Sequence, residues 1–296
     1  MTNSMTAAAA KRSHSEFHDI NGLRHHVRIW GDAAAPPLFL LHGWMDVSAS
    51  FQFVVDELQR DWRVVAPDWR GCGHSAWAGG GYWFPDYYAD LDALLEIYAP
   101  DEPARLVGHS MGGVIACTYA GIRPARVAKV LSFEGFGLKR TTPSEAPERY
   151  RRWLDELSAE PRFRVYASFD ALAKRLHGDN PRLTPEKAQF IARAWAHETA
   201  TDKIELVHDP RHKRSNPVLF RIEELIACWR ECKAPVLWVF ARDSKGTGYL
   251  SDSAKELAER KGAFQDYREA WIDEAGHMMH HDQPAAVARL IEEFLD

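Results

Sequence analysis

The chain has 296 residues, 46% of them hydrophobic and 27% charged, so it is long enough and apolar enough to bury a sizeable core. Its 37 Lys and Arg residues against 42 Asp and Glu residues give a net charge of −5, which excludes the basic surface that nucleic acid or an anionic membrane would require. No run approaches the roughly 18 apolar residues of a membrane-spanning helix. We therefore expect a cytoplasmic monomer or homodimer whose partner is a small molecule.

The start of the chain and its cysteines carry no targeting or disulfide signal. An alanine tract at 7–10 precedes Lys11 and Arg12, which is the wrong order and too short an apolar run for a secretory signal. We expect residues 1–14 to form a disordered tail. Four cysteines without zinc-ligand spacing predict free thiols in a reducing compartment and no metal site.

From residue 15 to residue 137, strand-like runs alternate with helical patterns. The dipeptide Asn21-Gly22 between two such runs is a strong hairpin signal. The expected strands are 16–20, 23–30, 38–41, 62–66, 105–108 and 127–133, and the expected helices are 48–60, 85–98 and a helix-like run at 114–119. This alternation predicts a mostly parallel sheet that is covered by helices on both faces.

From residue 138 the pattern becomes helical, and strand character returns only near residue 235. The helical segments are 147–157, 169–177, 185–196 and 222–231, and the later elements are strands at 235–240 and 266–272 and helices at 252–261 and 284–295. We interpret 138–229 as an inserted helical cap on a core formed by 15–137 and 230–296. A polar stretch at 208–214 is interpreted as a solvent-facing loop or short hairpin.

A strand, a sharp turn and a helix meet at Gly108-His109-Ser110-Met111-Gly112. A nucleophile on a strained turn needs neighbours without side chains, because strand and helix crowd together there. The helix that begins at Met111 points free N–H groups at whatever forms above Ser110. The pattern therefore predicts Ser110 as a nucleophile.

Two further segments supply the other parts of such a site. His277 follows the last expected strand in a Gly-His turn, downstream of the nucleophile and of either candidate acid, and is the candidate base. An oxyanion hole needs two N–H donors, one from the residue after the nucleophile and one from the loop after the third strand. Met111 and Trp44, the latter in His42-Gly43-Trp44, are in place for these roles.

Together these motifs resemble the α/β-hydrolase superfamily. The resemblance rests on H-G-W, on D-W-R-G-C-G-H-S at 68–75, on G-H-S-M-G-G and on the terminal G-H, and it covers about 16–137 and 235–296. The run E-G-F-G-L followed by A-P-E-R-Y-R-R-W-L is similar to the serine hydrolase-like branch. The 68–75 stretch resembles epoxide hydrolases and haloalkane dehalogenases, but those enzymes use an aspartate nucleophile. Ser110 in its place favours acyl transfer.

The sequence offers two positions for the acid of the triad. In many relatives the acid follows the seventh strand, three residues after a glycine. Here Ala241 takes the place of that glycine, Ser244 occupies the acid position, and Asp243 is one residue short. Some haloalkane dehalogenases instead place the acid after the sixth strand, where this chain has Glu134. We favour Glu134 and keep Asp243 as the alternative.

The resemblance implies a serine hydrolase that forms an acyl-enzyme and needs no cofactor. The 11 tryptophans and the aromatic cap favour a small apolar or aromatic ester, with His109, Phe136 and Trp83 as candidate pocket residues. The same triad also serves carbon–carbon bond hydrolases and cofactor-free perhydrolases. A hydrolase-derived small-molecule receptor is the alternative of another class.

Overall fold

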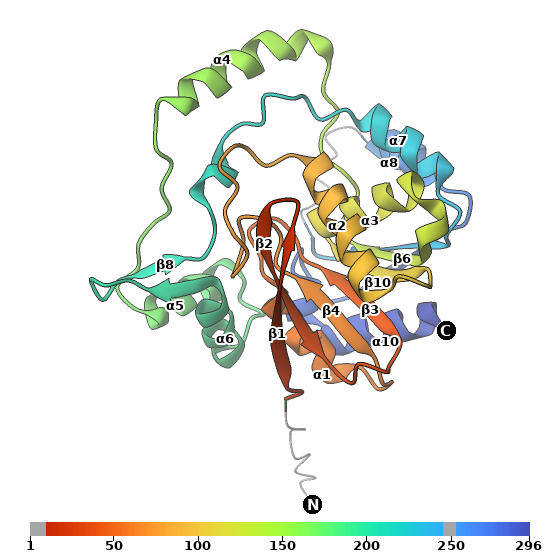
Figure 1. Ribbon diagram of the computed structural model, residues 1–296, viewed down its shortest axis with the longest axis horizontal. Coiled ribbons are helices and arrows are strands. Elements are labelled where there is room, and N and C mark those ends of the chain that lie inside the picture. The colour runs from red at the N-terminus through yellow and green to blue at the C-terminus, as the bar shows by residue number, and fades with distance from the viewer. Residues whose placement is uncertain (1–9, 245–252) are drawn as a thin grey trace, which may run out of the picture.

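The computed structural model describes residues 10–244 and 253–296, and it is built around one eight-stranded sheet (Figure 1). The strands of this sheet are β1 Ser13–Ile20, β2 Leu23–Trp30, β3 Pro37–Leu41, β4 Arg63–Pro67, β5 Ala104–His109, β6 Val127–Phe133, β9 Val236–Ala241 and β10 Tyr267–Ile272. The helices that pack with it are η1 Ser48–Phe51, α1 Gln52–Glu57, α2 Phe84–Tyr98, α3 Met111–Ile122, η2 Pro124–Arg126, α7 Ile222–Glu231, α8 Ser253–Lys261, α9 Met279–Asp282 and α10 Pro284–Leu295.

The strand order is β1-β2-β4-β3-β5-β6-β9-β10, and the strands from β4 to β10 run parallel to their neighbours. Only β1 and β2 are antiparallel, β1 to β2 and β2 to β4. The central strand β3 is buried along its whole length, as expected for a strand that is covered on both faces. The predicted α/β fold with a mostly parallel sheet is therefore confirmed.

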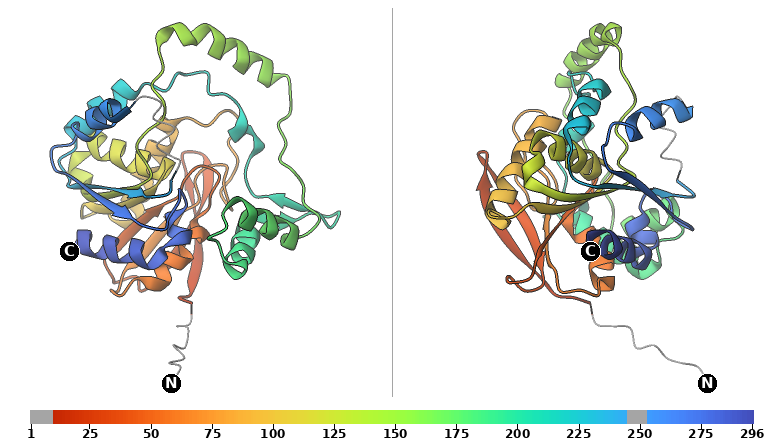
Figure 2. Two further views of the ribbon diagram at one scale, coloured as in Figure 1. Left: turned by 180° about the vertical axis from the view of Figure 1, so that it is seen from behind. Right: turned by 90° about the vertical axis from the view of Figure 1, so that its right-hand side faces the viewer.

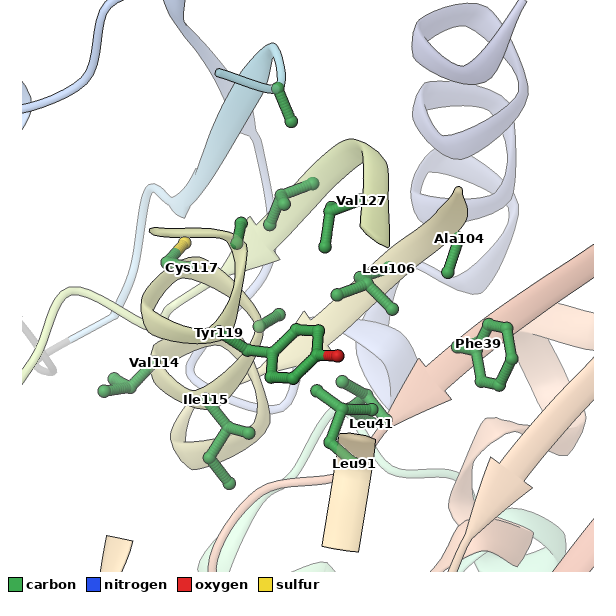
Figure 3. Close-up of a cluster of buried hydrophobic side chains, with 14 of the residues drawn as sticks. Phe39, Leu41, Leu91, Ala104, Leu106, Val114, Ile115, Cys117, Tyr119 and Val127 are labelled. Atoms are coloured by element: carbon green, nitrogen blue, oxygen red, sulfur yellow. The ribbon is translucent and has the colours of Figure 1, made fainter. Parts of the chain in front are cut away.

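Alternate residues along each strand face two separate cores. On one face, Phe39 and Leu106 pack with residues of α2, α3 and α7 (Figure 3). On the other, Leu40 and Val107 pack with residues of α1, α9 and α10. The right-hand view of Figure 2 shows helices on both sides of the sheet. All the parallel strands therefore end at one edge, where the loops that carry the candidate site residues meet.

The β1–β2 hairpin turns at Asn21 and Gly22, whose φ angles of 50° and 76° fit the predicted hairpin turn. The first strand begins at Ser13, which pairs with Trp30, so the expected tail of residues 1–14 ends earlier than predicted. The cause is cross-strand pairing with β2, which a short polar run does not reveal. Residues 1–9 of that tail lie outside the described residues.

The block between β6 and β9 contains more than helices. Its further elements are η3 Pro143–Glu145, α4 Ala146–Leu157, α5 Phe169–Asp179, α6 Pro185–Trp195, the strands β7 Ala196–Glu198 and β8 Ile204–Leu206, and η4 Pro210–Lys213. Helices α5 and α6 share a small core with the β7–β8 pair. Helix α4 has no buried residue and stands apart from the other helices (Figures 1 and 2). In the described part of the chain, no helix combines the length and the apolar character needed to cross a membrane.

Helix α7 lies inside the expected cap range, 138–229, but it packs with the core. Its residues Ile222 and Trp229 are fully buried and belong to the apolar cluster that includes α3. A Cβ on Gly121 of α3 would lie 1.8 Å from the carbonyl oxygen of Cys228, so the two helices touch through their backbones. The cap therefore ends before α7, earlier than the boundary at residue 229 that the sequence suggested. An amphipathic helix has the same sequence pattern whether it belongs to a cap or to the core.

The polar stretch 208–214 is not solvent-facing, as the sequence suggested. His208 and Asp209 are each only 1% exposed. The Asp209 carboxylate accepts a hydrogen bond from Tyr82 Oη (2.6 Å) and contacts Arg211 Nε at 2.9 Å. The His212 ring stacks on the Tyr82 ring at 3.7 Å. Asp209 and His212 are buried against Tyr82 in the loop that follows β4, whereas neither ring nitrogen of His208 has a hydrogen-bond partner among the described residues.

Candidate active site

Ser110 lies at the apex of the turn between β5 and α3, with φ 50° and ψ −114°. This strained backbone persists only where the surroundings enforce it, and such strain is common at functional sites. A Cβ on Gly108 would come within 2.4 Å of the Gly112 backbone, and a Cβ on Gly112 within 2.1 Å of the Leu41 carbonyl oxygen. Glycine is therefore required at both positions, because β5, α3 and β3 pack closely together there. Ser110 is held where a nucleophile would stand.

The loop after β3 passes directly beside Ser110. A Cβ on Gly43 would lie 2.8 Å from His109 Nδ1 and 3.2 Å from the Ser110 Cβ, so a side chain here would displace a neighbour. Trp44 follows, with its side chain 54% exposed, and Met45 has a φ of 59°. Met111 is the first residue of α3, so its N–H belongs to the group that has no partner inside the helix. The two predicted oxyanion donors therefore lie on segments adjoining the serine.

The structure brings His277 and Glu134 together. His277 Nδ1 lies 3.4 Å from Glu134 Oε2, and the Glu134 side chain is 1% exposed while that of His277 is 40% exposed. Glu134 directly follows β6, and its φ of 56° turns the chain away from the strand. A buried carboxylate beside Nδ1 would hold the proton on that nitrogen and leave Nε2 as the basic one.

The Glu134 carboxylate is fixed by the loop in which relatives carry the acid. Oε1 accepts a hydrogen bond from the backbone N–H of Ala241 at 3.0 Å, and Oε2 accepts one from the Ser244 hydroxyl. The sequence prediction noticed Ser244 only as a missing acid. In the structure the Ser244 hydroxyl faces the Glu134 carboxylate. This contact follows from the pairing of β6 with β9, which the sequence does not reveal.

Asp243, the alternative acid, contacts a different group. Its Oδ2 accepts a hydrogen bond from Arg182 Nη2 at 2.7 Å, and both side chains are more than 40% exposed. Because one residue reverses the direction of a side chain next to a strand, Asp243 and Ser244 face opposite ways. The structure places Glu134, and not Asp243, against His277.

His109 lies behind the histidine and not on a substrate-facing surface. It is 2% exposed, and its Nε2 is 2.8 Å from the backbone oxygen of His277. Burial, together with the neighbouring His280 and His277, holds the pKa of His109 well below its usual value. A neutral His109 therefore donates from Nε2 to the carbonyl and fixes the loop that carries His277.

The two aromatic pocket candidates are placed differently from each other. Phe136 is 4% exposed and stacks on Phe240 at 4.3 Å inside the core, so its assignment to a substrate pocket is wrong. Its side chain turns inward because Glu134 and Gly137, both with positive φ, redirect the chain after β6. Trp83 is half-buried just before α2, and no contact within the described part of the chain places it at Ser110.

Helix α6 and the segment before it attach to the loops that frame the site. Trp195 Nε1 donates to Asp46 Oδ1 at 2.9 Å in the loop after β3. Lys187 Nζ donates to the carbonyl oxygen of His281 in α9 at 2.7 Å. Helix α6 therefore contacts both the segment that carries Trp44 and the segment that follows His277.

Comparison with known proteins places this geometry in a family. A family model described as the alpha/beta hydrolase fold matches residues 36–284. A serine hydrolase-like protein of Danio rerio is 27% identical over 310 residues, covering 98% of this chain and 91% of the relative. A 3-hydroxybutyrate-oligomer hydrolase of Cupriavidus necator is 29% identical over 272 residues, covering 88% of each.

A solved structure agrees over nearly the whole chain. The thioesterase domain from the curacin biosynthetic pathway superposes with a TM-score of 0.85 at 23% identity, covering 95% of this chain and 99% of that one. This likeness shows the fold, and the sequence relatives support a hydrolase of the serine hydrolase-like branch. The resemblance expected from the motifs is confirmed: this chain belongs to the α/β-hydrolase family.

Proposed function

We propose that the protein is a serine hydrolase that cleaves small apolar or aromatic carboxylic esters through Ser110, His277 and Glu134. The observation that carries the proposal is the buried Glu134 carboxylate 3.4 Å from His277 Nδ1, in a chain whose Ser110 sits on a strained turn. Strained nucleophile, histidine and oriented acid are the three parts that acyl transfer by a serine needs.

The chemistry proceeds in two halves. Ser110 Oγ attacks the ester carbonyl carbon while His277 Nε2 takes its proton, and the oxyanion is held by the Met111 and Trp44 N–H groups. The carbonyl–oxygen bond to the alcohol then breaks, and His277 returns the proton to that alcohol. Water attacks the acyl-enzyme with His277 again as the base, releasing the acid and the free serine.

The preference for apolar substrates rests on one aromatic residue near the serine, Trp44. Trp44, a residue that is 54% exposed, adjoins Gly43, which lies against Ser110. An exposed indole beside a reactive group offers an apolar face to an acyl or alcohol group. Relatives named as a 3-hydroxybutyrate-oligomer hydrolase and as a thioesterase domain agree with acyl transfer.

Labelling with a fluorophosphonate tests the nucleophile directly. The unmodified protein should be labelled and should turn over short p-nitrophenyl esters, whereas Ser110→Ala should lose the label and nearly all turnover, since loss of a serine nucleophile costs about 10⁶ in kcat. Ser158→Ala, which alters an exposed serine on the far end of α4, is the matched control and should behave as the unmodified protein does.

Three outcomes decide among the activities. Labelling of Ser110→Ala at full strength would refute the nucleophile. Labelling of the unmodified protein without ester turnover would favour a carbon–carbon bond hydrolase or a perhydrolase. A protein that binds small molecules but takes no label would fit the receptor alternative.

A further inference from the structure

A second cluster of reactive side chains lies directly behind the proposed catalytic histidine. Asp46 in the loop after β3, His109 at the end of β5 and His280 in α9 are 2%, 2% and 0% exposed. One ligand atom from each of the three lies within 4.8 Å of the other two. The ester mechanism uses none of these side chains as a reacting group.

The Asp46 carboxylate is oriented by donors on one oxygen only. Oδ1 accepts hydrogen bonds from Val47 N at 2.8 Å, from Trp195 Nε1 at 2.9 Å and from the Ser50 hydroxyl. Oδ2 lies 3.4 Å from His280 Nε2 and has no hydrogen-bond partner among the described residues. Because the hydrogen bonds are made to Oδ1, Oδ2 is available to bind a metal ion.

The proton on His109 is placed by its neighbour. Nε2 faces the carbonyl oxygen of His277 at 2.8 Å, which requires a donor, so in the neutral ring Nδ1 carries the lone pair. Nδ1 is buried and finds no hydrogen-bond partner in the described chain. A histidine that donates one N–H to a backbone carbonyl and offers the other nitrogen is the usual arrangement of a metal-bound imidazole.

His280 completes the group inside an aromatic shell. Both of its ring nitrogens are buried without hydrogen bonds to any described residue. Its ring centroid lies 4.5 Å from that of His109 and 5.5 and 5.7 Å from those of Phe51 and Phe133. Polar groups in such a dry place cost free energy unless something satisfies them.

We propose that Asp46 Oδ2, His109 Nδ1 and His280 Nε2 bind one Zn²⁺ ion. Two imidazoles and one carboxylate form a ligand set that zinc prefers, with a fourth position for water. Ligands about 2.1 Å from a tetrahedral ion stand about 3.4 Å apart, which matches the separation of 3.4 Å between Asp46 Oδ2 and His280 Nε2.

The ester mechanism proposed above does not require this ion. It joins the loop after β3, the strand that leads to Ser110 and the short helix α9. Through His109 Nε2 it also fixes the carbonyl of His277. Ion binding therefore stabilises the arrangement of three segments that frame the active site, and it does not depend on the identity of the substrate.

Titration of the chelator-treated full chain with Zn²⁺ tests the site. The protein is equilibrated with the ion before each measurement, because the ligands are buried. We expect one ion per chain by isothermal titration calorimetry, a raised Tm, and tetrahedral absorption bands when Co²⁺ replaces Zn²⁺. His280→Gln and Asp46→Asn should each lower the affinity by at least about 100-fold, because two protein ligands hold the ion poorly.

Two controls separate this site from its surroundings. His14→Gln removes an exposed histidine, and His277→Gln removes the half-exposed one nearest the cluster; both should bind Zn²⁺ as the unmodified protein does. The proposal is overturned if the unmodified protein takes up no stoichiometric ion, or if His277→Gln abolishes binding while Asp46→Asn does not. Should the variants fail to fold, anomalous diffraction from zinc-soaked crystals decides, since density anywhere but between the three side chains refutes the site.

Discussion

At the level of single residues, the identity of the triad acid has the largest consequence. Glu134→Gln should lower kcat for p-nitrophenyl esters by up to about 10⁴-fold, because an amide cannot hold the histidine tautomer or stabilise the imidazolium. Folding should persist, since Gln can still accept from the Ala241 N–H. Steady-state kinetics and circular dichroism of the purified variant measure both effects.

Asp243→Asn is the matched carboxylate-to-amide change. Asp243 pairs with Arg182 on the surface, and an exposed ion pair contributes about 0–1 kcal/mol, so turnover should change less than about threefold. A severe loss in Asp243→Asn together with a mild one in Glu134→Gln would transfer the role of the acid to Asp243.

Ser244 should matter through the carboxylate that it contacts. Ser244→Ala removes a hydrogen bond to Glu134 Oε2 but leaves the one from Ala241. A hydrogen bond to a charged group contributes about 1.5–3 kcal/mol, so kcat should fall by about 10- to 100-fold with little change in KM. Ser244→Thr, which keeps the hydroxyl, should recover most of the rate; equal loss in both variants would show that the hydroxyl plays no part.

The residues that sequence could identify are those whose role depends on local geometry. Ser110 is marked by the glycines around it, and His277 by its place after the last strand. The orientation of Glu134 and the contact from Ser244 depend on β6 and β9 lying side by side, which is a long-range fact. His109 was grouped with the pocket because its position in the chain does not reveal which way a buried ring points.

At the level of elements, α4 and α7 allow a matched comparison of two tryptophans. Trp229 on α7 is 0% exposed and packs on Trp238 and Phe264, whereas Trp153 lies on α4, which buries no residue. Trp229→Ala should lower the free energy of unfolding by about 3–5 kcal/mol. Trp153→Ala should change it by less than about 0.5 kcal/mol.

Urea denaturation followed by circular dichroism measures both values. Similar losses for the two variants would show that α4 packs as tightly as α7, contrary to the structure.

The same two helices show what the sequence can and cannot predict about whole elements. Periodicity located both helices to within a residue or two, but it could not tell a helix that covers the sheet from one that stands apart. The β7–β8 pair was missed because three-residue strands leave no pattern.

At the level of the whole molecule, the chain buries several histidines at the end of the sheet where the site lies. Burial lowers the pKa of His208 to about 3 and that of His212 to about 4, and it also lowers the pKa of His42 and of His281. Neutral imidazoles are thus part of how the segment 208–214 packs on the core. The sequence contains 14 histidines, but only the fold determines which of them are buried in the neutral form.

Stability should therefore fall in mild acid. A histidine whose pKa is lower in the folded than in the unfolded chain stabilises fully above its unfolded pKa of about 6.5, and that contribution is lost as pH falls toward the folded value. For His212 the window runs from about 6.5 down to about 4, with a slope of up to about 1.4 kcal/mol per pH unit. The lowered pKa values of Asp46 and Asp68 act in the same direction only near and below about 3.8, so they do not obscure this window.

His212→Gln tests this account, since glutamine keeps hydrogen-bonding capacity and does not titrate. The free energy of unfolding of the variant, measured by urea denaturation at several pH values between 6.5 and 4.5, should fall less steeply than that of the unmodified protein. An unaltered slope in His212→Gln would mean that His212 takes up its proton equally in the folded and unfolded chain. The stacking of its ring on Tyr82 and the burial of Asp209 beside it would then tolerate a charged imidazole.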